Sequence, residues 1–361
     1  MGVEVMISQE AAGAKLIRTN NNMDAIRYVM AFTVLVSHFN DLTGSSLFVL
    51  LRMDLVVAMF FTLSGFLVFD SYHRHPSLRR YITSRARRIL PPYFFIVLAC
   101  AFGFAAISTL SPGEYFTSWH WWRYTLANLG FMNFIEPTLP GVFTGGQMVQ
   151  PYVDGSLWTM KVEWFLYLSV PVVSYIIYKM RSVPHARNLA IFVIVIMSIA
   201  YRYGFNLLHD YTGKHIYSIL ARQFFGQMSF FYIGALLRIY LREFLSYKWI
   251  FGVLIVIGCA ASFIFYDAFI FITPFAFSGL VIWLSMVGRW GHLLSRHDNV
   301  SYDVYLYHFP VIQLGVYLGI RNLDPLLGVA IAAVVTLLLS FASWNFIGRR
   351  FINKGKLHSG F

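Results

Sequence analysis

Charged residues are scarce in this sequence. Asp, Glu, Lys and Arg together make up 12% of its 361 residues, about half of the ~25% that is typical of soluble domains. Hydrophobic residues make up 58%, and the mean hydropathy is +0.62. Because one soluble core cannot bury so much apolar surface, the composition excludes an ordinary soluble domain and indicates a membrane protein.

Cysteines and common cofactor motifs are also rare or missing. The two cysteines, Cys100 and Cys259, lie inside apolar runs, so we expect neither a disulfide nor thiol catalysis. The sequence contains no GxxxxGK(S/T), GxGxxG, HExxH, CxxC or GxSxG motif. His73 and His75 stand without a carboxylate, which makes a weak metal site. We therefore predict no metal and no permanently bound cofactor.

Long apolar runs recur from residue 24 onward. Each is close to the about 20 residues that a helix needs to cross a bilayer. We predict an all-α polytopic protein with a tail over 1–23, one transmembrane domain over 24–347 and a basic tail over 348–361. The ten expected spans are 24–44, 47–70, 90–110, 156–178, 189–205, 217–238, 248–266, 268–288, 299–320 and 325–347.

The distribution of Lys and Arg predicts the orientation. With the N-terminus inside, 21 of the 28 basic residues fall on the inner side and seven on the outer side or in outer helix halves. We therefore expect both termini in the cytoplasm, and we read the net charge of +12 as a topology signal rather than as nucleic-acid binding. The first twenty residues do not resemble a removable signal peptide, so the first span serves as the targeting signal.

A long outer loop over about 111–155 is rich in aromatic residues. Its Trp119, Trp121, Trp122, Tyr115 and Tyr124 have two interpretations. They stack on sugar faces, or they form an ordinary interfacial aromatic belt.

Arg27 and His38 are ionisable residues at the two ends of the first apolar run. Eleven residues separate them, which places both on one helix face about 16 Å apart. Such residues in a span are candidates for a functional site. The alternative is that Arg27 reaches the lipid headgroups while His38 is a hydrogen-bonded structural residue. Asp24, one turn before Arg27, can pair with it.

Two further ionisable residues fall at comparable depths. Glu163 lies about 10 Å from the outer boundary, close to the depth of His38. His308 lies about 14 Å from the inner side, next to Pro310, which frees a backbone carbonyl. The alternatives are a helix-locking ion pair for Glu163 and a packing role for His308.

Arginines cluster just before the third span, in "RRYITSRARRILPPYFF". Arg85 and Arg88 belong to this cluster, and guanidinium groups suit the recognition of phosphate. The cluster is therefore a candidate seat for a nucleotide-like ligand. The alternative is a topology signal that also binds anionic lipid.

Five motifs together resemble the acyltransferase-3 family of integral membrane O-acyltransferases. They are "DAIRYVMAFTVLVSH", "FFTLSGFLV", "RARRILPPY", "LWTMKVEWFLY" and "SYDVYLYHFPV", in this order along the chain. The resemblance covers essentially all ten spans. One departure stands before "FFTLSGFLV", where family members often have Gly-Val-Asp and this chain has Val56, Val57 and Ala58; Asp54 is a candidate substitute for the acid.

The resemblance implies transfer of an acyl group, usually acetyl, from cytoplasmic acyl-CoA to a hydroxyl of a glycan or lipid-linked glycan, through a central channel in a bacterial cytoplasmic membrane. Together with the depths of these residues, it makes His38 the expected general base or acyl relay, with Glu163 positioning it or relaying a proton. It places the donor substrate at Arg27, Arg85 and Arg88, and pocket-shaping roles at Ser64, Trp158, Tyr167 and His308.

Two other functions stay open at this stage. Some family members carry a fused esterase-like SGNH domain that completes the transfer, and we expect none here. The chain is then either the transferase itself or an acyl carrier that feeds a separate outer-face transferase. A proton-coupled transporter would also place Arg, His and Glu inside a helix bundle, although we find no inverted repeat. The sequence does not indicate the oligomeric state.

Overall fold

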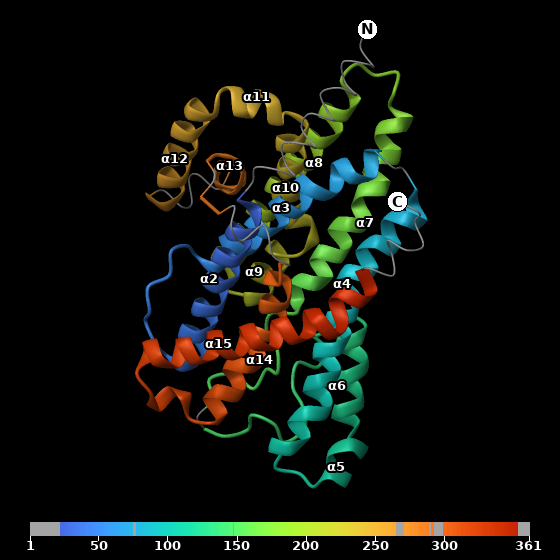
Figure 1. Cartoon of the computed structure of the whole chain (residues 1–361). Helices are drawn as coiled ribbons and strands as arrows, with labels where there is room; N and C mark the ends of the chain where they lie inside the picture. Colours follow the sequence, from blue (N-terminus) through green and yellow to red (C-terminus); the bar gives the residue numbers. More distant parts are fainter. Residues whose placement is uncertain are drawn as a thin grey trace. The chain divides into compact units, whose positions relative to one another are not determined.

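The structure, a computed structural model, describes residues 22–74, 77–146, 148–264, 271–288, 290–291 and 299–352 (Figure 1). Over these residues the protein is an all-α membrane protein with no strand. Four helical segments are long and apolar enough to cross a membrane, namely Leu78–Ile107, Trp158–Lys179, Ala186–Thr212 and Pro325–Ile352. Most of the two predicted tails, and the side chains of His73 and His75, lie outside the described residues.

The chain divides into two compact units. Unit 1 comprises Met1–Tyr28, Asp54–Ser77 and Val162–Asn299, and unit 2 comprises Val29–Met53, Leu78–Lys161 and Val300–Phe361. Three helices contribute residues to both units, namely α2 (Met23–Thr43), α7 (Trp158–Lys179) and, through its first residue alone, α3 (Met53–Arg74). Arg27 and His38 both lie on α2, as the apolar run predicts.

Unit 1 is built mainly from helices in the middle of the sequence. In addition to residues of α2 and α7, it contains α3 (Met53–Arg74), α8 (Ala186–Thr212), α9 (His215–Ala221), α10 (Phe224–Ile239), α11 (Leu241–Ser246), α12 (Lys248–Ile264) and α13 (Thr273–Met286). Helix α10 packs against α8 and α13, and α12 packs against α13.

Two glycines allow α3 and α10 to approach closely. A Cβ added at Gly65 would lie 1.9 Å from the Phe231 carbonyl oxygen, and one added at Gly234 would lie 2.2 Å from the Thr62 carbonyl oxygen. Backbone atoms therefore occupy the space that any side chain would need. Gly65 belongs to the "FFTLSGFLV" motif, so this contact gives the motif's glycine a structural reason.

Unit 2 combines the arginine-rich helix, the outer loop and the C-terminal helices. Its elements besides parts of α2 and α7 are α4 (Leu78–Gly103), η1 (Phe104–Ile107), α5 (Pro112–Thr117), α6 (Trp119–Leu129), α14 (Ser301–Tyr317), η3 (Ile320–Asn322), α15 (Pro325–Ser343) and η4 (Trp344–Gly348). Figure 1 shows α6 beside α4 and α15 beside α14, and these pairs are in contact.

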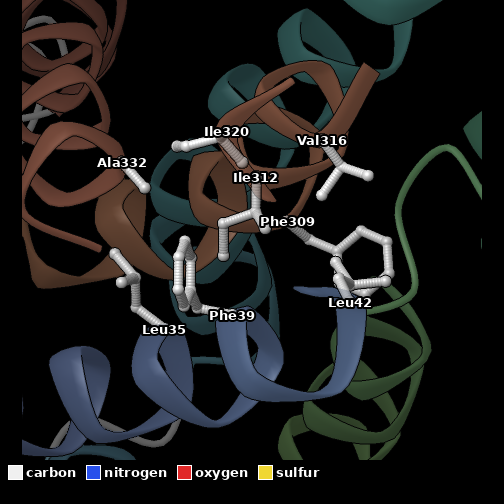
Figure 2. Close-up of a cluster of buried hydrophobic side chains, with 8 residues drawn as sticks. All are labelled: Leu35, Phe39, Leu42, Phe309, Ile312, Val316, Ile320 and Ala332. Carbon is white, nitrogen blue, oxygen red and sulfur yellow. The ribbon is translucent and has the colours of Figure 1, made fainter. Parts of the chain in front are cut away.

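A buried hydrophobic cluster joins α2 to α14 and α15 within unit 2 (Figure 2). It consists of Leu35, Phe39, Leu42, Phe309, Ile312, Val316, Ile320 and Ala332. Phe39 and Phe309 are next in sequence to His38 and His308. The cluster therefore fixes the two helix segments that carry the predicted histidines.

Candidate functional site: a histidine pair between α2 and α14

His38 and His308 form a direct hydrogen bond in unit 2. Nδ1 of His38 lies 2.8 Å from Nε2 of His308, and the two rings are stacked with their centroids 5.0 Å apart. His308 is fully buried, whereas His38 is half-buried. The two histidines that the sequence places inside separate spans therefore meet, although 270 residues separate them.

The hydrogen bonds of His308 determine which nitrogen of His38 is basic. Nδ1 of His308 lies 2.7 Å from the Tyr305 carbonyl oxygen, which can only accept a hydrogen bond. In a neutral His308 the proton therefore sits on Nδ1, and Nε2 accepts. His38 must then donate from Nδ1, which leaves its Nε2 unprotonated. The pair thus presents Nε2 of His38 as a free base.

Phe309 holds the other side of the His38 ring. Its ring meets His38 edge-on, with centroids 5.0 Å apart and an interplanar angle of 80°. Because Phe309 also belongs to the buried cluster, the orientation of His38 is tied to the packing of α2 on α14. This is the rigid support that a catalytic base requires.

Glu163 lies in a polar group of unit 1. Its Oε1 accepts hydrogen bonds from the Tyr167 hydroxyl at 2.5 Å and from the Ser64 hydroxyl at 3.2 Å. Tyr167 OH also lies 3.3 Å from Ser64 Oγ. Three of the predicted site residues are therefore brought together on α3 and α7. The orientation of His38 by Glu163 joins residues of different units and stays a prediction, and Trp158 is the half-buried first residue of α7.

Arg27 is paired near the start of α2. Its guanidinium lies 3.6 Å from Asp24, the pairing that their spacing predicts. Asp24 also accepts a hydrogen bond of 2.6 Å from the Asn299 side chain. Asp54, the candidate substitute acid on α3, lies 3.7 Å from Arg202 of α8.

Arg85 and Arg88 lie on α4, which begins twelve residues before the predicted span. The arginine-rich segment is therefore helical and continuous with the apolar one, through Pro91 and Pro92. Arg88 is exposed and Arg85 is half-buried. The Asp303 carboxylate, which accepts a 2.6 Å hydrogen bond from Ser343, interacts electrostatically with Arg88.

Much of the predicted outer loop is ordered against α4. Helix α6 runs antiparallel to α4, since Trp121 Nε1 donates to the Ala101 carbonyl at 2.8 Å and Tyr93 OH donates to the Asn128 carbonyl at 2.6 Å. Tyr115 OH also donates to Ala101. Trp121, Tyr115 and Tyr124 are buried packing residues, whereas Trp119 and Trp122 are 69% and 49% exposed.

Asp154, at the end of this loop, is a buried carboxyl group that the sequence analysis did not identify. Oδ1 accepts hydrogen bonds from the Ser156 amide at 2.9 Å and the Ser156 hydroxyl at 2.7 Å, whereas Oδ2 is buried without a hydrogen-bond partner. Burial raises the pKa of Asp154 to about 7, although the bonds from Ser156 lower it. The thiol of Cys100 and the phenols of Tyr93 and Tyr124 lie within its electrostatic range.

The raised pKa of Asp154 predicts a pH-dependent stability. The folded state holds the Asp154 proton up to about pH 7, whereas the unfolded chain releases it near the usual value of 3.8. The contribution to the free energy of unfolding is therefore complete below pH 3.8 and is lost as pH rises through 7. We expect Asp154→Asn to reduce the loss of stability between pH 5 and pH 8 by about 2–3 kcal/mol. Thermal unfolding in detergent at the two pH values, with and without the substitution, measures this difference, and equal pH slopes would contradict it.

The described residues contain no group of three or more His, Cys, Asp or Glu side chains that could hold a metal ion. The hydrogen bonds of the His38–His308 pair support the chemistry of an imidazole base, with Nε2 of His38 as the unprotonated nitrogen.

The comparisons with known proteins give a consistent result. The model of a family described as an acyltransferase domain matches residues 20–345. The chain is 27% identical over 346 residues to a protein named O-acetyl transferase from Shigella phage Sf6, covering 93% of this chain and 97% of that protein. It is 29% identical over 327 residues to Nodulation protein 10 of Rhizobium leguminosarum bv. viciae, covering 83% of this chain and 84% of that one. No solved structure matches.

Proposed function

Because the chain belongs to the acyltransferase-3 family, we propose that it transfers an acetyl group from cytoplasmic acetyl-CoA to a hydroxyl of a cell-envelope or exported glycan. The observation that carries the proposal is the His38–His308 pair, which leaves Nε2 of His38 unprotonated. The name of the phage relative, O-acetyl transferase, supports acetyl as the acyl group and oxygen as its acceptor. The acceptor glycan is free or lipid-linked.

The proposed reaction needs one base and no external co-reactant. Nε2 of His38 takes the proton of the acceptor hydroxyl while that oxygen attacks the thioester carbonyl carbon. The C–S bond then breaks, and the departing thiolate of CoA takes the proton back from His38. In a two-step version Nε2 itself attacks the thioester carbonyl carbon, the C–S bond breaks and CoA leaves as the thiolate. The hydroxyl oxygen then attacks the acyl-imidazole, the C–N bond breaks to return free His38, and the hydroxyl proton passes to the CoA thiolate.

The proposed arrangement places the donor and the acceptor on opposite sides of a bacterial cytoplasmic membrane. The apolar runs support ten crossings, the basic-residue distribution supports both termini inside, and a central channel lets the thioester reach His38. Arg27, Arg85 and Arg88 then hold the phosphates of the donor on the inner side. Glu163, which Ser64 and Tyr167 hold by hydrogen bonds, orients His38 or relays a proton. Ser64, Trp158, Tyr167 and His308 shape the pocket.

Transfer by the purified protein tests the proposed function. Protein in lipid nanodiscs is given labelled acetyl-CoA and a panel of glycans, and the label is followed. Labelled glycan supports the transferase. Label that stays on the protein would instead indicate an acyl carrier, and the absence of acetyl-CoA binding would favour a transporter.

Replacing Arg85 and Arg88 tests the donor site. We expect Arg85→Lys and Arg88→Lys each to raise the KM for acetyl-CoA about tenfold, because lysine keeps the positive charge but cannot form a bidentate contact with phosphate. Arg79→Lys, on the same helix and exposed, is the matched control and should change nothing. If all three lysine variants keep the normal KM, these arginines act only as topology signals.

A further inference from the structure

The last part of the outer loop is fastened to the helix that carries His308. We call residues 148–156 the strap. Gln313 of α14 is fully buried, and its Nε2 donates hydrogen bonds to the carbonyl oxygens of Gln150 at 2.8 Å and Tyr152 at 2.6 Å. A Cβ at Gly155 would lie 2.8 Å from the Phe309 ring, and Met148 packs on the buried cluster. The strap is therefore held against α14 at both of its ends.

Two buried acceptor atoms of this region have no donor. They are Oε1 of Gln313 and Oδ2 of Asp154, each on a side chain that is at least nine-tenths buried. The hydrogen bonds that hold the strap are made by the other polar atom of each side chain, Nε2 of Gln313 and Oδ1 of Asp154. A buried polar atom without a partner costs about 1–3 kcal/mol. The two acceptors therefore indicate a missing donor.

The kind of atom that is missing defines the chemistry of the ligand. Oε1 of Gln313 accepts hydrogen bonds, whereas Oδ2 of Asp154 accepts them when the carboxyl group is ionised and donates one while it holds its proton. The complementary ligand must therefore both donate and accept. A phosphate or carboxylate would be repelled by the ionised Asp154, whereas neutral hydroxyl groups fit both states. Tyr124, whose buried hydroxyl also has no partner, lies within electrostatic range of Asp154 and can bond to the same ligand. The site is therefore suited to a polyhydroxylated molecule.

The strap lies next to the histidine pair. Phe309, which Gly155 abuts, is the residue that meets His38 edge-on. Gln313 follows His308 by five residues on α14, a rise of about 7.5 Å and a turn of about 140°, so it projects from another face of the helix than His308. The Phe309 ring is the contact that the strap and His38 share, which places the strap one side chain away from the histidine pair.

We propose that the strap, with Asp154 and Gln313, is the subsite that binds the non-reacting hydroxyls of the acceptor sugar and so selects which hydroxyl meets His38. The inference rests on the proposed function, because it concerns the acceptor of that reaction. A buried water molecule would satisfy the same two atoms, so the test must distinguish a bound water molecule from a bound sugar.

Asp154→Asn is the sharpest substitution. The substitution keeps Oδ1, which accepts the hydrogen bonds from Ser156. It replaces Oδ2, a hydrogen-bond acceptor when ionised, by an NH₂ group that only donates and has nearly the same size. Gln313→Met removes Oε1 at similar volume, together with the Nε2 that fastens the strap, so its unfolding temperature is read beside its KM. Thr138→Ala is the matched control, because it removes a hydrogen bond to a carboxylate, that of Glu136 at 2.8 Å, elsewhere in the same loop. Thermal unfolding of all three variants reports the structural cost of each.

The readout is the KM of methyl glycosides, and of their single-deoxy analogues, with acetyl-CoA as donor. For the glycoside that the wild type uses best, we expect one deoxy analogue to raise the KM at least tenfold. Asp154→Asn and Gln313→Met should each raise the KM of the parent glycoside at least tenfold and keep kcat within about twofold. With the deoxy analogue as substrate, the variants and the wild type should have the same KM, because the hydroxyl that the subsite binds is already missing. Thr138→Ala should leave the KM unchanged. The assays are run at pH 8, where Asp154 is ionised and its Oδ2 is an acceptor.

Two outcomes overturn the inference and are distinguishable. If the wild type acetylates glycosides and the variants lower only the unfolding temperature, the two atoms bind a structural water and the strap is not a subsite. If the wild type acetylates no glycoside, the proposed function fails and the inference fails with it.

Discussion

His38→Ala is expected to abolish acetyl transfer while the protein stays in the membrane. The substitution removes Nε2 of His38, the unprotonated ring nitrogen of the pair that does not accept the hydrogen bond between the two rings, and general-base catalysis contributes about 10²–10⁴ in rate. His38 is half-buried, and the cluster around Phe39 and Phe309 holds α2 against α14 without it. Turnover with labelled acetyl-CoA, normalised to the amount of purified protein, gives the comparison.

His308 supplies the matched control for His38. In His308→Gln the side-chain oxygen can still accept the hydrogen bond from Nδ1 of His38, whereas in His308→Ala nothing can. We expect His308→Gln to retain more activity than His308→Ala, and both to retain more than His38→Ala. Near-normal turnover in His38→Ala would show that His38 is not the catalytic base. Equal losses of activity in the two His308 variants would show that the hydrogen bond from Nδ1 of His38 does not contribute to catalysis.

Gly65→Ala is expected to prevent unit 1 from folding. Its new Cβ would lie 1.9 Å from the carbonyl oxygen of Phe231 and 2.7 Å from its carbonyl carbon, and neither backbone atom can move aside alone. The cost should exceed the about 1–3 kcal/mol of ordinary overpacking. Size-exclusion chromatography of detergent-extracted protein reports it as lost monodisperse protein.

Gly204→Ala is the control for this substitution. Gly204 lies inside α8, and a Cβ there would meet nothing within 4 Å. Alanine favours a helix over glycine by about 1 kcal/mol, so the variant should be as stable as the wild type or more so. If Gly65→Ala is as well folded as Gly204→Ala, α3 and α10 do not approach as the structure describes.

The helices were predictable because an apolar run of bilayer length has few structures open to it. The ends of the helices were less predictable, and α4 is an example. The predicted span begins at residue 90, where arginines give way to apolar residues, whereas the helix begins at Leu78. A change of polarity marks a membrane boundary, and the backbone hydrogen bonds of a helix continue across it. The predicted span 217–238 is likewise two helices, α9 and α10.

The sequence selected His38 and His308 as candidates, but it did not predict how they contact each other. Spacing and depth selected His38 and His308, yet only tertiary structure shows that Nδ1 of His38 faces Nε2 of His308. Asp154 and Gln313 were not predicted, because the prediction selected ionisable residues inside the expected spans. Asp154 lies in a loop, and Gln313 is uncharged. The Asp-Gly-Ser sequence at 154–156 was the available signal, since such an Asp often accepts hydrogen bonds from residues just after it. No sequence pattern indicates that Gln313 fastens the strap.

NMR of the surface glycans of cells tests the central claim most directly, because it reads the product and its position together. Cells that lack the gene receive either the wild-type gene or the His38→Ala variant, with equal amounts of protein in their membranes. We predict an O-acetyl resonance on one glycan hydroxyl with the wild type and none with His38→Ala. The same resonance at full intensity with His38→Ala would contradict the assignment of His38 as the group that moves the acetyl.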